Sequence, residues 1–108
     1  MTEISVYPAD YQDLIRTAVA IKFLIYVNGG GATKSIVEDV LMMRLPSVDR
    51  SLAHGVMNDI EFHGFDAASI RNKQWRFDET AGPQLSEYPE IGKIERIRWY
   101  RGKPECFN

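Results

Sequence analysis

Several hydrogen-bonding side chains follow one side of a predicted helix at residues 48–63. Arg50 and His54 lie four residues apart, and Ser47 and Ser51 accompany them at the start of the same helix. Residues four apart share a helix face, so these side chains form one polar stripe. Side chains of this kind near a helix start can read base edges in the major groove of DNA. The alternative is an ordinary solvated face, because every amphipathic helix has a polar side.

A second run of residues hints at phosphate chemistry. In GGGATKS, residues 29–35, Lys34 and Ser35 follow closely after three glycines. A P-loop needs glycine directly before the lysine and another five residues earlier, so that backbone N–H groups surround phosphate. Thr33 and Asn28 occupy those two positions. The sequence therefore does not predict a nucleotide site.

Residues that commonly bind metals or act as nucleophiles are few and scattered. His54 and His63 lie nine residues apart with no cysteine near them, whereas a metal site needs three or four converging ligands. Cys106 has no predicted base or pocket around it. The acidic residues show no spacing that forces a carboxylate pair. We therefore expect neither a metal, nor another cofactor, nor an enzymatic activity.

Size and charge narrow the class of protein further. The chain has 108 residues, which suit one domain spanning residues 1–108. Its net charge of −2 excludes a uniformly basic nucleic-acid-binding protein but permits a local basic face. A single cysteine, an N-terminus unlike a signal peptide and the lack of a long apolar stretch predict a cytoplasmic protein without membrane contact.

Three helices are predicted in the first two-thirds of the chain, at about residues 11–27, 34–43 and 48–63. Apolar residues recur at spacings of three and four in the first of them, and glycines 29–31 end it. Thr33 is a suitable N-cap for the second helix. A third helix, capped by Ser47, completes the set.

The predicted core consists of apolar residues that share a face on these helices and on a later strand. It comprises Leu14, Ile15, Ala18, Ile21, Ile25, Ile36, Val40, Leu52, Val56, Ile60, Trp75 and Phe77. On the third helix, Val48, Leu52, Val56 and Ile60 form the stripe that is expected to face inward. The first helix is apolar on every side at residues 23–27, so we also expect a homodimer that covers this surface.

The last third of the chain has the pattern of β-strands. Residues 69–77 predict a hairpin with its turn at Asn72-Lys73. A loop at 81–92 precedes a predicted strand at 93–101, where β-branched and aromatic residues alternate. The sequence therefore predicts an α+β fold in which three helices pack against a small antiparallel sheet.

The order of these motifs resembles the winged helix-turn-helix superfamily, in particular small bacterial, plasmid or phage regulators. The resemblance covers residues 10–78 and leaves a C-terminal extension. It depends on the run 28–36, on Arg50-Ser51-Leu52, on Phe62-His63-Gly64-Phe65 and on Trp75-Arg76-Phe77. It implies a recognition helix followed by a wing hairpin, and a homodimeric transcription regulator that binds double-stranded DNA.

The resemblance also implies a set of DNA-binding residues in three places. The start of the third helix would read bases, the start of the second helix would hold phosphate, and the wing would contact the backbone. These residues are Thr33, Lys34, Ser35, Ser47, Arg50, Ser51, His54, Arg71, Lys73 and Arg76.

A second hypothesis is a non-enzymatic protein-interaction module, an inhibitor or adaptor on the same scaffold. Fold alone does not decide between the two. The acidic region 29–64, the apolar run 23–27 and the tail rich in tryptophan and arginine favour this second hypothesis, since Trp, Tyr and Arg are typical interface anchors. Both hypotheses stay open on the sequence alone.

Overall fold

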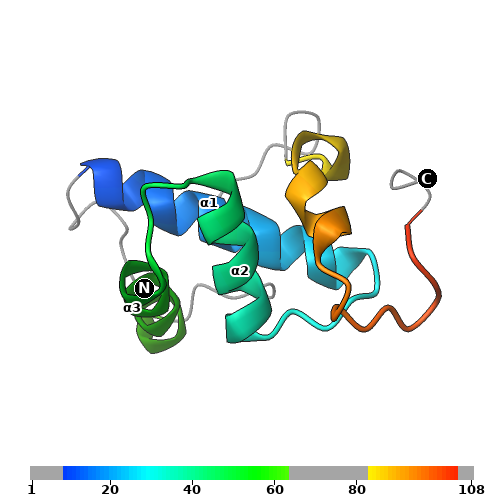
Figure 1. Cartoon of the computed structure of the whole chain (residues 1–108). Coiled ribbons are helices and arrows are strands. Elements are labelled where there is room, and N and C mark those ends of the chain that lie inside the picture. The colour runs from blue at the N-terminus through cyan, green and yellow to red at the C-terminus, as the bar shows by residue number, and fades with distance from the viewer. Residues whose placement is uncertain (1–8, 64–82, 105–108) are drawn as a thin grey trace.

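The fold is a cluster of three helices closed by two short helical turns. A computed structural model describes residues 9–63 and 83–104. Its α-helices are α1 (Ala9–Val27), α2 (Lys34–Arg44) and α3 (Arg50–His63), and they are followed by the 3-10 helices η2 (Leu85–Glu87) and η3 (Pro89–Lys93). Figure 1 shows α2 crossing in front of α1, while α3 is seen nearly end-on. The three predicted helices are confirmed.

The central helix is α1, which is buried on several sides. Ile15, Ala18, Ile21 and Ile25 are fully buried as predicted, and so is Val19 on another side of the helix. Burial of large aliphatic side chains is the main favourable contribution to folding. The predicted core residues Ile36, Val40, Val56 and Ile60 are also buried, whereas Leu14 is only partly buried.

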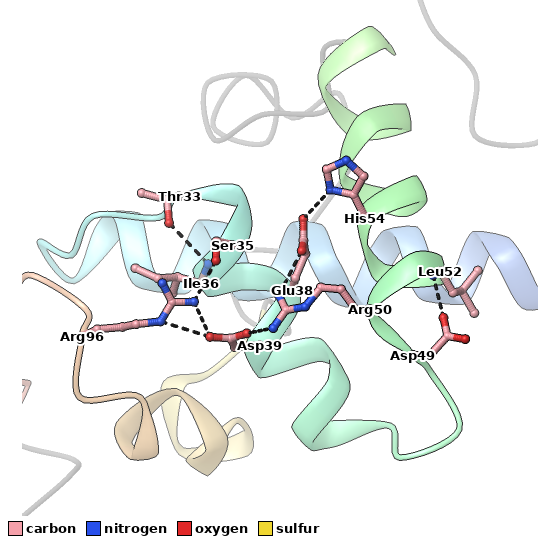
Figure 2. Close-up of polar contacts among 10 residues, drawn as sticks. All are labelled: Thr33, Ser35, Ile36, Glu38, Asp39, Asp49, Arg50, Leu52, His54 and Arg96. Carbon is pink, nitrogen blue, oxygen red and sulfur yellow. Dashed lines mark hydrogen bonds and ion pairs between the residues drawn. The ribbon is translucent and has the colours of Figure 1, made fainter.

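Side-chain caps define where α2 and α3 begin (Figure 2). Thr33 caps α2 as predicted, because its hydroxyl accepts a hydrogen bond of 3.3 Å from the Ile36 N–H. The prediction that Ser47 caps the third helix is wrong. Asp49 takes this role and accepts a hydrogen bond of 2.8 Å from the Leu52 N–H, so that α3 begins at Arg50. Aspartate is as good an N-cap as serine.

The inward face of α3 differs from the predicted one. Leu52 is 38% exposed, whereas Ala53 and Met57, which are not in the predicted core, are buried, with Met57 only 1% exposed. A step of four residues turns a helix by about 400°, so a stripe spaced only by fours drifts around the surface. The observed face, Ala53-Val56-Met57-Ile60, combines steps of three and one and stays on one side.

The predicted α+β fold is wrong for the described part of the chain. Residues 9–63 and 83–104 contain no strand and only one isolated antiparallel bridge, between Gly30 and Trp99. The predicted strand at 93–101 is instead the end of η3 followed by turns. The predicted hairpin 69–77, with core residues Trp75 and Phe77, lies outside the described residues.

The reason for the missing C-terminal strand is the spacing of its buried residues. Ile91, Ile94 and Ile97 are all buried. The Ile94 N–H donates to the Ile91 carbonyl at 3.3 Å, and the Ile97 N–H donates to the Ile94 carbonyl at 3.4 Å. This period of three is that of a 3-10 helix, whereas a half-buried strand would bury every second residue.

The C-terminal turns complete the core that the helices begin. Leu85, Ile91, Ile94 and Ile97 belong to the same hydrophobic cluster as the buried faces of α1, α2 and α3. A polar contact reinforces this arrangement, since the Arg44 guanidinium of α2 lies 4.0 Å from the centre of the Tyr88 ring. Arg44 also forms a 3.0 Å ion pair with Glu90.

No helix in the described part of the chain has both the length and the apolar character needed to cross a membrane.

Candidate interaction surfaces

A buried carboxylate lies between α2 and the start of α3. The Glu38 side chain, on α2, is only 5% exposed. The Arg50 Nη1 group donates to Glu38 Oε1 at 3.0 Å, and His54 Nδ1 lies 3.1 Å from the other oxygen, Oε2 (Figure 2). A carboxylate removed from water needs such partners, because losing hydration without replacement is costly.

The neighbouring carboxylate, Asp39, connects three segments of the chain. Arg50 Nη2 lies 2.5 Å from Asp39 Oδ1, and Arg96 Nε lies 3.1 Å from Asp39 Oδ2 (Figure 2). Partial burial alone would raise the pKa of Asp39. The hydrogen bonds and positive charges of Arg96 and Arg50 outweigh this effect and hold the pKa below its ordinary value.

We call Glu38, Asp39, Arg50, His54 and Arg96 the α2 charge cluster. It links α2 to α3 through Arg50 and His54, and it links α2 to the C-terminal segment through Arg96. Sequence reasoning missed both carboxylates. Their partners lie between 11 and 57 positions away in the chain, so no periodic pattern connects them.

The predicted base-reading residues divide into two groups. Arg50 and His54 point toward the carboxylates of α2 (Figure 2), and both side chains remain about half exposed. Ser47 and Ser51 are exposed. The structure therefore brings two of these four residues into the α2 charge cluster.

The predicted phosphate-binding residues at the start of α2 all have partners within the protein. The Thr33 hydroxyl caps the helix, and Ser35 Oγ accepts a 2.9 Å hydrogen bond from Arg96. Lys34 forms an ion pair with Glu61 of α3. The hydrogen bond and charge of Lys34 lower the pKa of Glu61. Arg71, Lys73 and Arg76, the predicted wing contacts, lie outside the described residues.

A different surface forms where the C-terminal segment meets the end of α1. The Gly31 N–H donates to the Arg98 carbonyl and the Tyr100 N–H donates to the Gly29 carbonyl, both at 2.9 Å. The Trp99 ring packs over Gly30, where a Cβ would lie 2.8 Å from the ring and 2.7 Å from Ile25 Cγ2. Only glycine fits at this position, because real Cβ atoms do not approach other atoms so closely.

This meeting point is hollowed, and we call it the α1-end groove. Its lining consists of Tyr26, Val27, Asn28, Gly29, Gly30, Tyr100 and Arg101. Three large side chains remain accessible there, since Tyr26 is 48% exposed, Val27 45% and Tyr100 71%. The predicted apolar run 23–27 is thus partly covered by the protein itself: Leu24 and Ile25 are buried, and Tyr26 and Val27 are not.

Among the described residues that line the groove, the charged one is Arg101. The segments that meet there, residues 23–32 and 97–104, contain Arg98, Arg101 and Lys103 but no aspartate or glutamate. Arg98 and Arg101 are exposed, and no carboxylate in the described part of the chain pairs with either of them. The groove therefore combines aromatic and aliphatic surface with a positive rim.

Metal ligands do not converge in this part of the protein. Within residues 9–63 and 83–104 there is no group of three or more His, Cys, Asp or Glu side chains that could hold a metal ion.

No protein-family model, curated protein or solved structure matches this chain.

Proposed function

We propose that this protein is a small protein-interaction module, an adaptor or inhibitor that acts in the cytoplasm by binding another protein. The proposal rests on the difference between cationic side chains that are paired with carboxylates and those that are not. Lys34 and Arg50, at the predicted DNA-binding face, are paired with carboxylates. Arg98 and Arg101, close to the exposed Tyr100 in the chain, have no carboxylate partner among the residues that the structure describes.

This distribution favours a protein partner for an electrostatic reason. DNA affinity comes largely from cations that neutralise phosphates. At the start of α2 and α3, each cation would have to leave a carboxylate, and that carboxylate would then repel the phosphate. Tyrosine and arginine together on an accessible surface are instead typical of the residues that dominate protein interfaces.

Binding of double-stranded DNA is the second candidate function, and one observation favours it. The helices α2 and α3 pack against each other, and only residues 45–49 connect them, as in a helix-turn-helix. Ser51 and Asn58 are exposed on α3, where they could reach base edges. If the protein binds DNA in this way, a homodimer would place its two α3 helices on adjacent half-sites of the DNA.

Two measurements on the full chain separate these candidates. Fluorescence anisotropy with labelled mixed genomic DNA, at low and at moderate salt, measures DNA affinity. Affinity purification from the cells that produce the protein, followed by titration of the purified partner, measures protein binding. We expect saturable binding of one protein partner and no DNA binding at moderate salt. Sequence-dependent DNA binding that persists at moderate salt would replace the proposal with the second candidate.

A further inference from the structure

The α1-end groove is an accessible concave surface with both apolar and charged character. We propose that it binds an extended acidic peptide segment of a partner protein, with one aromatic or aliphatic side chain as the anchor. This inference rests on the proposed function and specifies the chemistry of its partner. The segment would place its anchor on the groove floor and its carboxylates at the rim.

Several polar groups on the floor of the groove already have hydrogen-bond partners, which suits an apolar side chain. The Gly29 carbonyl accepts from the Tyr100 N–H, and the Gly30 N–H donates to the Ile25 carbonyl at 2.8 Å. The Asn28 side-chain amide donates to the Leu24 carbonyl, also at 2.8 Å. About half of the surface that remains accessible is apolar, and Val27 and the tyrosine rings contribute to it. Placing a Leu or Phe side chain there removes apolar surface from water, which favours binding.

The rim selects for negative charge. Arg101 lines the groove, and Arg98 lies on the other side of Trp99 in the same segment. Glutamate or aspartate residues flanking the anchor would form charge-assisted hydrogen bonds with the Arg101 guanidinium. The chain as a whole is negative, so this local positive surface also steers an acidic partner toward the groove rather than toward α3.

The same features favour a peptide over a nucleic acid. The Gly30 N–H and the Gly29 carbonyl, which could otherwise bond to a base edge, already have partners within the protein. The C-terminal end of α1, which carries partial negative charge, also borders the floor. A phosphate there would be repelled, whereas an uncharged anchor side chain would not.

A peptide titration tests this inference with the full chain. The first probe is a labelled twelve-residue peptide with a central phenylalanine flanked by glutamates. Matched peptides replace the phenylalanine by serine or the glutamates by lysines, and an oligothymidylate of equal length represents nucleic acid. We expect saturable binding of the first probe alone, weakened by added salt.

Variants locate the binding site. Arg101→Glu and Tyr100→Ala alter exposed side chains and should each weaken binding about tenfold, equivalent to about 1.4 kcal/mol. The control is Arg16→Glu, which makes the same charge change at an exposed position in the first half of α1. It should change affinity less than about twofold, since steering falls off within a Debye length.

Several outcomes would overturn the inference. They are no saturable binding of the acidic peptide, equal effects of Arg101→Glu and Arg16→Glu, or tighter binding of the oligonucleotide. Sedimentation at micromolar concentration gives a further outcome that would overturn it. If the wild type is a dimer and Arg101→Glu is a monomer, the groove is occupied by a second copy of the chain. If a protein partner binds the Arg101→Glu variant as tightly as the wild type but does not bind Ser51→Arg, the groove is not the binding site. That result would leave the proposed function intact. DNA binding with no protein partner would refute both.

Discussion

Gly30 and Trp99 contact each other so closely that residue 30 has no room for a side chain. Gly30→Ala should therefore push the indole ring away and destabilise the protein by about 1–3 kcal/mol, the usual cost of overpacking. Denaturant unfolding followed by tryptophan fluorescence measures the effect.

The control for this variant is Gly55→Ala in α3, where a new Cβ meets nothing within 4 Å. Alanine there should stabilise the helix by roughly 0.4–1 kcal/mol. If both variants are equally stable, the close packing of Trp99 on Gly30 is wrong.

The inward face of α3 gives a second prediction. Met57→Ala should cost about 2–5 kcal/mol, because this side chain is fully buried and leaves a cavity. Leu52→Ala should cost about 1 kcal/mol or less, because a large part of that side chain is already in water. Thermal unfolding compares the stabilities of the two variants. If Leu52→Ala is the less stable one, the inward face of α3 is the one predicted from the sequence.

The buried carboxylate gives a third prediction. Arg50→Ala should lower the midpoint of denaturant unfolding, because Glu38 loses one of the two partners, Arg50 and His54, that it has among the described residues. Ser51→Ala, at the next position, changes an exposed side chain and should leave the midpoint almost unchanged. Equal midpoints for both variants would show that Arg50 does not support the fold.

Stability should also depend on pH through Asp39. Its pKa in the folded protein lies below the ordinary value of 3.8, so the unfolded chain binds a proton more readily. The ionised group therefore stabilises the fold above about pH 4, and this contribution is lost as pH falls through the lowered pKa. Unfolding free energies of the wild type and of Asp39→Asn, measured from pH 7 to pH 2, should converge at the acidic end. A constant difference across this range would contradict the ion pairs of Asp39 with Arg50 and Arg96.

The sequence is a good guide to structure here where the information is local. Helical periodicity, the glycines after α1 and the Thr33 cap are each read within a few residues, and they place the three helices correctly. The face of α3 is harder, because Leu52 and Ala53 compete for one inward position and the larger side chain is not the buried one. Around Ile94 and Ile97, β-branched residues suggest a strand, although their spacing of three fits the 3-10 turns.

The candidate surfaces depend on contacts between distant parts of the chain, which the sequence does not reveal. Glu38 looks like any exposed helical glutamate until Arg50 and His54 are brought to it by the packing of α3. Tyr100 and Arg101 are far from Tyr26 in sequence, and the bridge between Gly30 and Trp99 helps to bring them to the same groove.

That bridge has a consequence for the order of folding. Contacts among α1, α2 and α3 join neighbouring parts of the chain and can form quickly, whereas pairing Gly30 with Trp99 closes a loop of about two-thirds of the chain. Loop closure of this length costs entropy and delays contact formation. While the protein is being synthesised, the first three helices leave the ribosome well before Trp99. During that interval Ile25, which lies beside Trp99 at Gly30 in the folded protein, lacks this cover, and the nascent chain is prone to aggregate through the exposed apolar surface.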